Sequence, residues 1–265
     1  MSSNALLRLT GVNVIIGRNT VLSVDQLSLS SQPGIAAVFV GPNGAGKTSI
    51  INAITGYAKL SKSARIDFEP AGNVAHRSPA YIVRAGIART FQSPAAFPSL
   101  TPLEVLSVAG SFSARATLLE KQPVSVARDL LGSLGLEPHQ ENRRLPLSML
   151  RRLELGRALI TGPRLLFLDE PTAGLDEEEK DWLKNLLCHG LRILGCQLHD
   201  CGASRFPAIT IGLVTHDMAF LQALGAASAL EQATTHFMNL GHVVSSGPLE
   251  CVLAQPVVDE VYFGH

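Results

Sequence analysis

The segment that most constrains the fold is a glycine-rich loop between a predicted strand and a predicted helix. An apolar run over residues 35–40 precedes the loop and predicts a buried strand, and residues 49–54 predict a helix. The loop matches the pattern G-x-x-x-x-G-K-[ST] at every fixed position. Its residues are Gly41, Pro42, Asn43, Gly44, Ala45, Gly46, Lys47 and Thr48. Because the N–H groups of such a loop point inward, the motif predicts a site for the phosphates of a nucleoside triphosphate.

Side chains at the end of the loop have predicted roles of their own. Lys47 would bridge the outer phosphates, and the Thr48 hydroxyl would ligate Mg²⁺. Ser49 begins the predicted helix, where unpaired N–H groups favour an anion, and we expect it to bind the nucleotide too. The alternative is a glycine-rich turn that matches the pattern by chance, and a second motif further along the chain weakens it.

Composition sets the class of protein. The chain has 265 residues, of which 46% are hydrophobic and 17% charged, so it can bury a large core as a single α/β domain over residues 1–265. The 22 basic residues balance the 22 acidic ones, and we therefore expect no nucleic-acid partner. No run approaches the roughly 18 apolar residues that span a bilayer, and no secretion signal is evident. We expect the four cysteines to be reduced.

The order of apolar runs predicts the layers of the fold. Strand-like runs alternate with helical ones, which is typical of a parallel sheet covered on both faces. Near the N-terminus, residues 6–16 and 21–30 instead predict an antiparallel pair joined by a turn at 17–19. Residues from about 93 to 162 predict a helical subdomain. A helix there is predicted to end at Gly135 and to carry five apolar residues on one face: Val124, Ala127, Leu130, Leu131 and Leu134.

A second motif places two carboxylates at the end of an apolar strand. Asp169 and Glu170 directly follow the run over 165–168, at the edge where α/β sheets hold their ligands. Asp169 would hold Mg²⁺, and Glu170 would polarise a water for attack on the γ-phosphate. Alone, the pair could equally be a strand that runs into a solvated turn. Combined with the phosphate loop, it predicts nucleotide hydrolysis.

The sequence here resembles a known family. Residues 168–176 are similar to the joined Walker B and D-loop segment of ABC-type ATPases, residues 88–92 resemble the Q-loop, and residues 213–218 resemble the H-loop. All of these occur in the family's order and cover nearly the whole chain. Within the family, residues 86–92, 97–101 and 258–264 look most like the ATPase subunits of branched-chain amino acid and urea importers.

This resemblance implies further roles. Gln92 would sense the γ-phosphate and Mg²⁺ and link them to a membrane partner, Asp176 would act across a dimer interface, and His216 would orient the attacking water. The alternative for His216 is a structural histidine at a strand end. The resemblance also implies ATP and Mg²⁺ as cofactors and transmembrane permease subunits as partners. It places the chain peripherally at the cytoplasmic face of a membrane.

The signature segment departs from the family pattern. Where the family resembles L-S-G-G-Q and caps the γ-phosphate of a dimer partner, residues 145–149 read Leu-Pro-Leu-Ser-Met. Pro146 has neither a hydroxyl nor an N–H, and Ser148 replaces a glycine that allows close backbone approach. We therefore expect the chain to serve its own ATP site well and its partner's site poorly. The second ATP-binding subunit would then be non-identical.

Two other departures concern adenine and a long insertion. The family's adenine-stacking aromatic is replaced by Ile16, which predicts apolar contact in place of stacking. Residues 188–207 carry Cys188, Cys196, His199 and Cys201. These are ligand types for Zn²⁺, but the spacing matches no metal pattern, and we expect free cysteines in an inserted loop.

Two other functions stay open at this level. A soluble ABC ATPase that acts on nucleic acid or ribosomes is disfavoured by the balanced charge and by the lack of a second cassette or coiled coil. A regulatory subunit that does not hydrolyse ATP is suggested by the degraded signature, while Glu170 argues against it.

Overall fold

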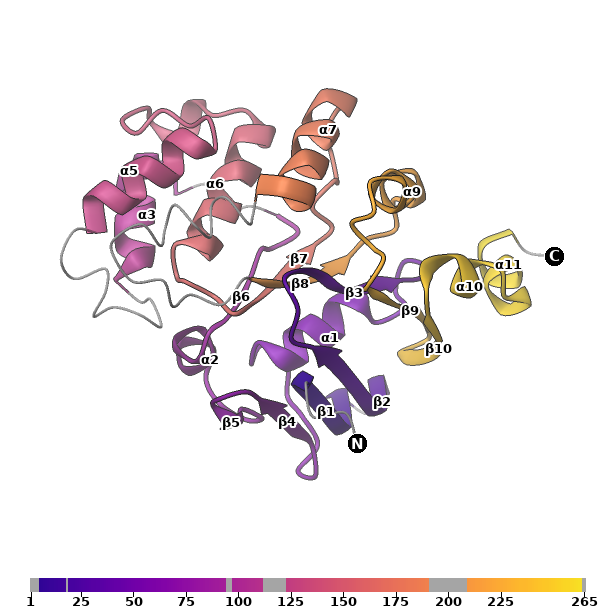
Figure 1. The fold of residues 1–265 in the computed structure, drawn as a ribbon. Helices are drawn as coiled ribbons and strands as arrows, with labels where there is room; N and C mark the ends of the chain where they lie inside the picture. The colour runs from indigo at the N-terminus through magenta and orange to yellow at the C-terminus, as the bar shows by residue number, and fades with distance from the viewer. Residues whose placement is uncertain (1–4, 18, 94–96, 112–122, 191–208, 264–265) are drawn as a thin grey trace.

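A single mixed sheet organises the computed structural model, which describes residues 5–17, 19–93, 97–111, 123–190 and 209–263 (Figure 1). Within these residues ten strands pair in the order β5-β4-β1-β2-β10-β9-β3-β8-β7-β6. The strands are β1 (Ala5–Ile16), β2 (Asn19–Ser30), β3 (Gly34–Val40), β4 (Arg65–Phe68), β5 (Gly72–Asn73), β6 (Ile87–Arg89), β7 (Leu165–Asp169), β8 (Thr210–Val214), β9 (Thr234–Asn239) and β10 (His242–Gly247).

Helices surround this sheet (Figure 1). They are α1 (Lys47–Ile54), α2 (Pro79–Ala85), α3 (Pro102–Gly110), α5 (Pro123–Ser133), α6 (Leu147–Leu159), α7 (Glu177–Asn185), α9 (Met218–Ala226), α10 (Leu249–Leu253) and α11 (Pro256–Phe263). Short helical turns cover Asn142–Arg144 and Leu186–Gly190. No helix of the described residues is long and apolar enough to cross a membrane.

The core strands are parallel and buried on both faces. β3, β8, β7 and β6 run parallel, and every residue of β7 and β8 is buried. Such continuous apolar runs are typical of a parallel sheet covered on both sides. β1 and β2 pair antiparallel, as the sequence predicts for the N-terminal part. The predicted α/β fold, with a mixed sheet and an antiparallel N-terminal part, is therefore confirmed.

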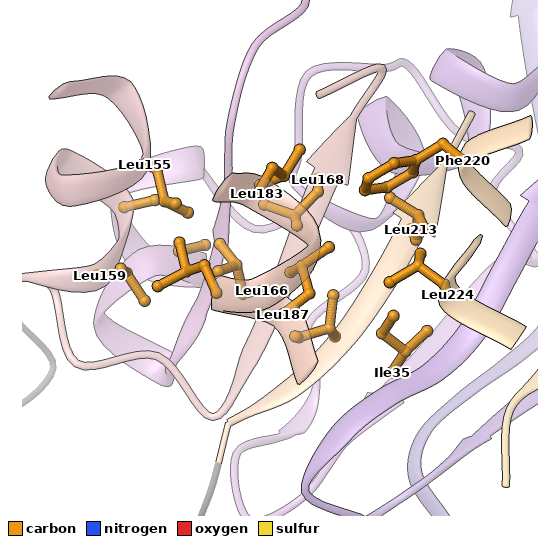
Figure 2. Close-up of a cluster of buried hydrophobic side chains, with 14 of the residues drawn as sticks. Ile35, Leu155, Leu159, Leu166, Leu168, Leu183, Leu187, Leu213, Phe220 and Leu224 are labelled. Atoms are coloured by element: carbon orange, nitrogen blue, oxygen red, sulfur yellow. The ribbon is translucent and has the colours of Figure 1, made fainter. Parts of the chain in front are cut away.

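Two apolar clusters hold the layers together. On one face α6, α7 and α9 place Leu159, Leu183 and Leu224 against strand residues such as Leu166 and Leu213 (Figure 2). On the other face the buried side of α1 packs with residues of β1, β2 and β4. Because both faces of the central strands are covered, the polar groups at their carboxyl ends have fixed positions.

The helices α3, α5 and α6 contact one another at one side of the sheet (Figure 1). The helix predicted before Gly135 is present as α5, on which Ala127 and Leu131 are buried and Val124 is 48% exposed. The assignment of one domain with a helical subdomain over about 93–162 stays a prediction.

Part of the predicted insertion lies outside the described residues. α7 begins at Glu177 as predicted and continues into the turn Leu186–Gly190, where Cys188 is half-buried and free. Cys196, His199 and Cys201 lie in the part of the chain that is not described, so their state stays a prediction.

Candidate functional site

The glycine-rich loop connects β3 to α1, as its sequence predicts. Gly41 has φ 151°, and a Cβ there would lie 2.2 Å from the carbonyl oxygen of Met238. Gly46 begins α1 with φ 97°, and a Cβ there would lie 3.1 Å from Gly241 Cα. A side chain at either position would collide with or strain the backbone, so the loop needs glycine where the motif has it.

The lysine of the loop is buried and folded over it. Lys47 Nζ donates hydrogen bonds to the carbonyl oxygens of Gly41 at 2.6 Å and Pro42 at 3.0 Å. It also lies 3.8 Å from Glu170 Oε1. Burial lowers the pKa of Lys47 below its ordinary value, although the negative charges of Glu170 and Asp169 act in the opposite direction. The Lys47 ammonium is therefore held where it would contact an anion bound in the loop.

Asp169 at the end of β7 faces both the loop and the neighbouring strand. Its Oδ1 accepts a hydrogen bond from the Thr48 hydroxyl at 3.3 Å, and its Oδ2 lies 2.9 Å from Arg89 Nη2. Burial raises the pKa of Asp169, while the Arg89 cation and the Thr48 hydroxyl act to lower it. The structure thus brings Asp169 and Thr48, the two predicted Mg²⁺ ligands at this point, into direct contact.

Glu170 points away from Asp169 and toward the H-loop segment. Its φ of 48° turns the backbone sharply at the strand end, an unusual conformation for a residue other than glycine. Its Oε2 accepts a hydrogen bond from the His216 backbone N–H at 3.2 Å and lies 2.8 Å from His216 Nδ1. The His216 side chain is 55% exposed, so the imidazole is accessible to solvent. Lys47, Glu170 and His216 therefore form one contiguous group.

Other predicted residues make no hydrogen bond or ion pair to this group among the described residues. The Gln92 side chain is exposed and makes no hydrogen bond to the described residues, although its carbonyl accepts one from Arg151. Asp176 caps α7 by accepting a hydrogen bond from Glu179 N–H. Ile16 is 66% exposed and shares a cavity of about 340 Å³ with Ser49.

Arg89 is a further residue of the site, and no sequence motif assigns it a role of its own. This side chain, in strand β6, is buried beside Asp169 and donates a hydrogen bond to Asn52 Oδ1. Its guanidinium carbon Cζ lies 4.5 Å from the centroid of the Phe91 ring. One feature of the sequence could have indicated a paired role for Arg89. It is a charged residue at the end of the short strand Ile87–Arg89, and a strand buried on both faces rarely carries an unpaired charge.

A fixed loop at a helix start, with a lysine and two carboxylates at the ends of parallel strands, defines a P-loop nucleotide-binding protein. Residues 24–173, more than half of the chain, match the ABC transporter family. The chain therefore belongs to the ABC transporter family, as an ATP-binding subunit with ATPase activity.

Relatives extend the match over nearly the whole chain. The high-affinity branched-chain amino acid transport ATP-binding protein BraF of Pseudomonas aeruginosa is 29% identical and covers 99% of both chains. LivG of Escherichia coli, with the same description, is 28% identical over 99% of both. A solved ATP-binding cassette of an ABC transporter is 25% identical, with a TM-score of 0.76, and covers 97% of this chain and 98% of that one.

The buried pair between Arg89 and Asp169 leads to a stability prediction. The variant Arg89→Met leaves a buried carboxylate without its cation, which should lower the free energy of unfolding by about 3 kcal/mol in urea denaturation. The control Arg65→Met removes the cation of an exposed pair with Asp67 and should change it by less than about 1 kcal/mol.

The double variant Arg89→Met, Asp169→Asn removes both charges and should recover part of the loss. Equal changes in the free energy of unfolding for Arg89→Met and Arg65→Met would show that the buried pair stabilises the fold no more than the exposed pair does.

Proposed function

We propose that this chain binds and hydrolyses Mg·ATP as one half of a dimer and drives a separate permease that imports an amino acid. The observation that carries the proposal is the convergence of Lys47, Glu170 and His216 beside a loop whose glycines are required by close packing. The names of the relatives favour a branched-chain amino acid over urea as the imported solute.

The phosphates would lie in the loop, against its N–H groups and the start of α1. The Lys47 ammonium would leave the carbonyl oxygens of Gly41 and Pro42 and pair with the outer phosphates, which are far stronger acceptors. A fixed cation and preorganised N–H groups stabilise the charge that develops on the transferring phosphoryl oxygens.

The water would be held by Glu170 and His216. One oxygen of Glu170 is already anchored to the backbone N–H and the imidazole of His216, which fixes the direction of the carboxylate. Its other oxygen is then available to accept a hydrogen bond from the attacking water. The exposed imidazole of His216 would contact the γ-phosphate and help to orient this water.

The residues present fit Mg²⁺. The Thr48 hydroxyl and the Asp169 carboxylate are hard oxygen donors in direct contact at the mouth of the loop. We infer that these two groups hold the ion, with Gln92 approaching when the nucleotide is bound. The ion would neutralise charge on the outer phosphates.

The adenine would lie beside α1. The cavity of about 340 Å³ that joins Ile16 to Ser49 is also lined by apolar Val14 and Ile15 and by polar Asn52 and Lys59. A purine fits a space of this size by apolar contact, which agrees with the predicted role of Ile16 in place of a stacking aromatic.

Two variants test the proposed chemistry. Lys47→Ala should abolish phosphate release and weaken nucleotide binding, because the outer phosphates lose their fixed cation. Glu170→Gln should keep ATP binding and lower turnover by at least about a hundredfold, since the amide cannot accept the proton of the water. The surface variants Lys62→Ala and Glu178→Gln serve as matched controls. A Glu170→Gln chain that hydrolyses ATP at the wild-type rate would refute the mechanism.

The permease would dock in an apolar groove next to the Gln92 segment. The groove has a volume of about 310 Å³ and lies between α2, α3 and α6. Apolar side chains at its opening include Tyr57, Phe91, Phe97 and Val108. Arg89 also lines the groove and pairs with Asp169, so this side chain connects the groove wall to the carboxylate. We infer that an apolar-faced cytoplasmic segment of the permease occupies it and holds the chain at the cytoplasmic face of the membrane.

The groove yields a prediction about transport. Val108→Glu introduces a charge into the groove opening and should lower permease co-purification and amino acid uptake at least about tenfold, while ATP binding is retained. Val124→Glu is a matched control, because Val124 is similarly exposed (48% against 57% for Val108) but lies on α5 outside the groove. Wild-type uptake by Val108→Glu would show that the permease docks elsewhere.

A second subunit would complete the ATP site. α6 begins at Leu147 with Pro146 at its N-cap, and no side chain caps the helix start. The Leu147 side chain is exposed but packs close to Gly174 of the D-loop segment. A Cβ on Gly174 would lie 3.1 Å from Leu147 Cδ2. The start of α6 therefore keeps unpaired backbone N–H groups, but it lacks the serine hydroxyl donor and the close backbone approach of glycine that the family signature provides. A non-identical partner with an intact signature would supply these donors.

The signature yields a prediction about asymmetry. The chain alone should hydrolyse ATP slowly, and the double variant Pro146→Ser, Ser148→Gly should speed its homodimer by about tenfold or more by restoring phosphate donors. Phosphate release measured over a range of protein concentrations reports this rate. If the wild-type chain already matches the double variant, the signature is not limiting and the non-identical partner is not needed.

A further inference from the structure

A polar junction joins α7 to the loop that carries His216. Asp217 follows His216 and caps α9 by accepting a hydrogen bond from Phe220 N–H at 2.9 Å. Its other oxygen lies 3.1 Å from Lys180 Nζ, and the nearby Thr172 hydroxyl favours the ionised carboxylate. Asp217 therefore has three polar partners.

These three partners come from both sides of the proposed reaction centre. Thr172 is buried two residues after Glu170, and Lys180 lies in the first turns of α7, which follows the same segment. Phe220 belongs to α9, which contacts α7 (Figure 1). The junction thus connects the segment that carries Glu170 to the loop that carries His216, in addition to the direct contact between these two residues.

Charge and burial favour a persistent contact. Burial opposes ionisation of Asp217, but the hydrogen bond from Phe220 N–H and the neighbouring Lys180 and Thr172 together lower the pKa of its carboxyl below the ordinary value. The hydrogen bonds to Glu177 and Asp217 raise the pKa of Lys180. Both groups are therefore charged at neutral pH. Glu177 lies on the same helix as Lys180, and its Oε1 is 3.0 Å from Lys180 Nζ. This contact helps to hold the ammonium in place.

We propose that Lys180 is a positioning residue that sets the orientation of His216 through Asp217. The imidazole of His216 is more than half exposed and contacts Glu170 through Nδ1, so its direction depends on where the backbone of its loop is fixed. Lys180 holds the carboxylate of the next residue, Asp217, whose backbone N–H donates a hydrogen bond to the Thr215 hydroxyl at 3.0 Å. This inference rests on the roles of Glu170 and His216 in the proposed function, and it adds a residue outside the recognised motifs.

The first test is kinetic and uses the full-length chain. Lys180→Ala should lower the maximal hydrolysis rate about tenfold, because a small displacement of a reacting group has a large effect on rate. The KM for ATP should change less than about twofold, since no group that binds the nucleotide is removed. Lys180→Arg should keep most of the activity. Lys184→Ala should leave the rate unchanged, because Lys184 lies one turn further along α7 and pairs with exposed Asp181.

The second test observes His216 directly. In the full-length chain labelled with ¹⁵N-histidine, the variant His216→Gln identifies the imidazole signals of His216. These signals should move in Lys180→Ala and stay in place in Lys184→Ala and Lys180→Arg. A role confined to helix packing would lower the thermal unfolding temperature without moving them. This readout needs no turnover, so it decides the question even where the chain hydrolyses slowly.

The outcomes separate the two proposals. If His216→Gln hydrolyses at the wild-type rate, the proposed function of His216 fails. If His216→Gln is slow while Lys180→Ala keeps both the wild-type rate and the wild-type His216 signals, the positioning role of Lys180 is overturned and the proposed function stands.

Discussion

The buried ion pair between Arg89 and Asp169 is the interaction around which the site is arranged. Two charges in the interior are tolerated only when their remaining donors and acceptors are also satisfied. Here Thr48 and Asn52, both on α1, supply these partners. The pair therefore fixes the ends of β6 and β7 relative to the phosphate loop. Phe91, which lies over the guanidinium, brings the apolar groove into the same network.

A second constraint lies beneath the phosphate loop. The β9–β10 hairpin approaches so closely that Gly41 contacts Met238 and Gly46 contacts Gly241. The Gly241 N–H also donates a hydrogen bond to the Ala45 carbonyl at 3.0 Å, and its own carbonyl accepts one from Ser23 N–H at 2.8 Å. A loop with no regular structure of its own is thus held by segments from β2 and from near the C-terminus. Such support keeps the N–H groups aimed at one point before a nucleotide arrives, which reduces the reorganisation needed during reaction.

Local patterns predicted a large part of this molecule. The phosphate loop, the strands before it and before Asp169, and the antiparallel pair at the N-terminus all depend on residues adjacent in sequence. Prediction was poorer where distant segments decide the outcome. Arg89 was not assigned a role because its partner lies 80 positions away, and the 48% exposure of Val124 depends on packing that helical periodicity alone does not encode.

The sequence by itself determined the kind of chemistry: glycines that permit the loop, a lysine that follows them, two carboxylates at a strand end, and a signature segment that departs from the family pattern. The tertiary structure decided how these groups meet. It turned Glu170 toward His216 through a positive φ, paired Asp169 with Arg89, and placed Lys180 against the residue after His216. The physical reason is that motifs encode residue types over short spans, whereas burial, desolvation and charge pairing depend on strands and helices that come together only when the sheet forms.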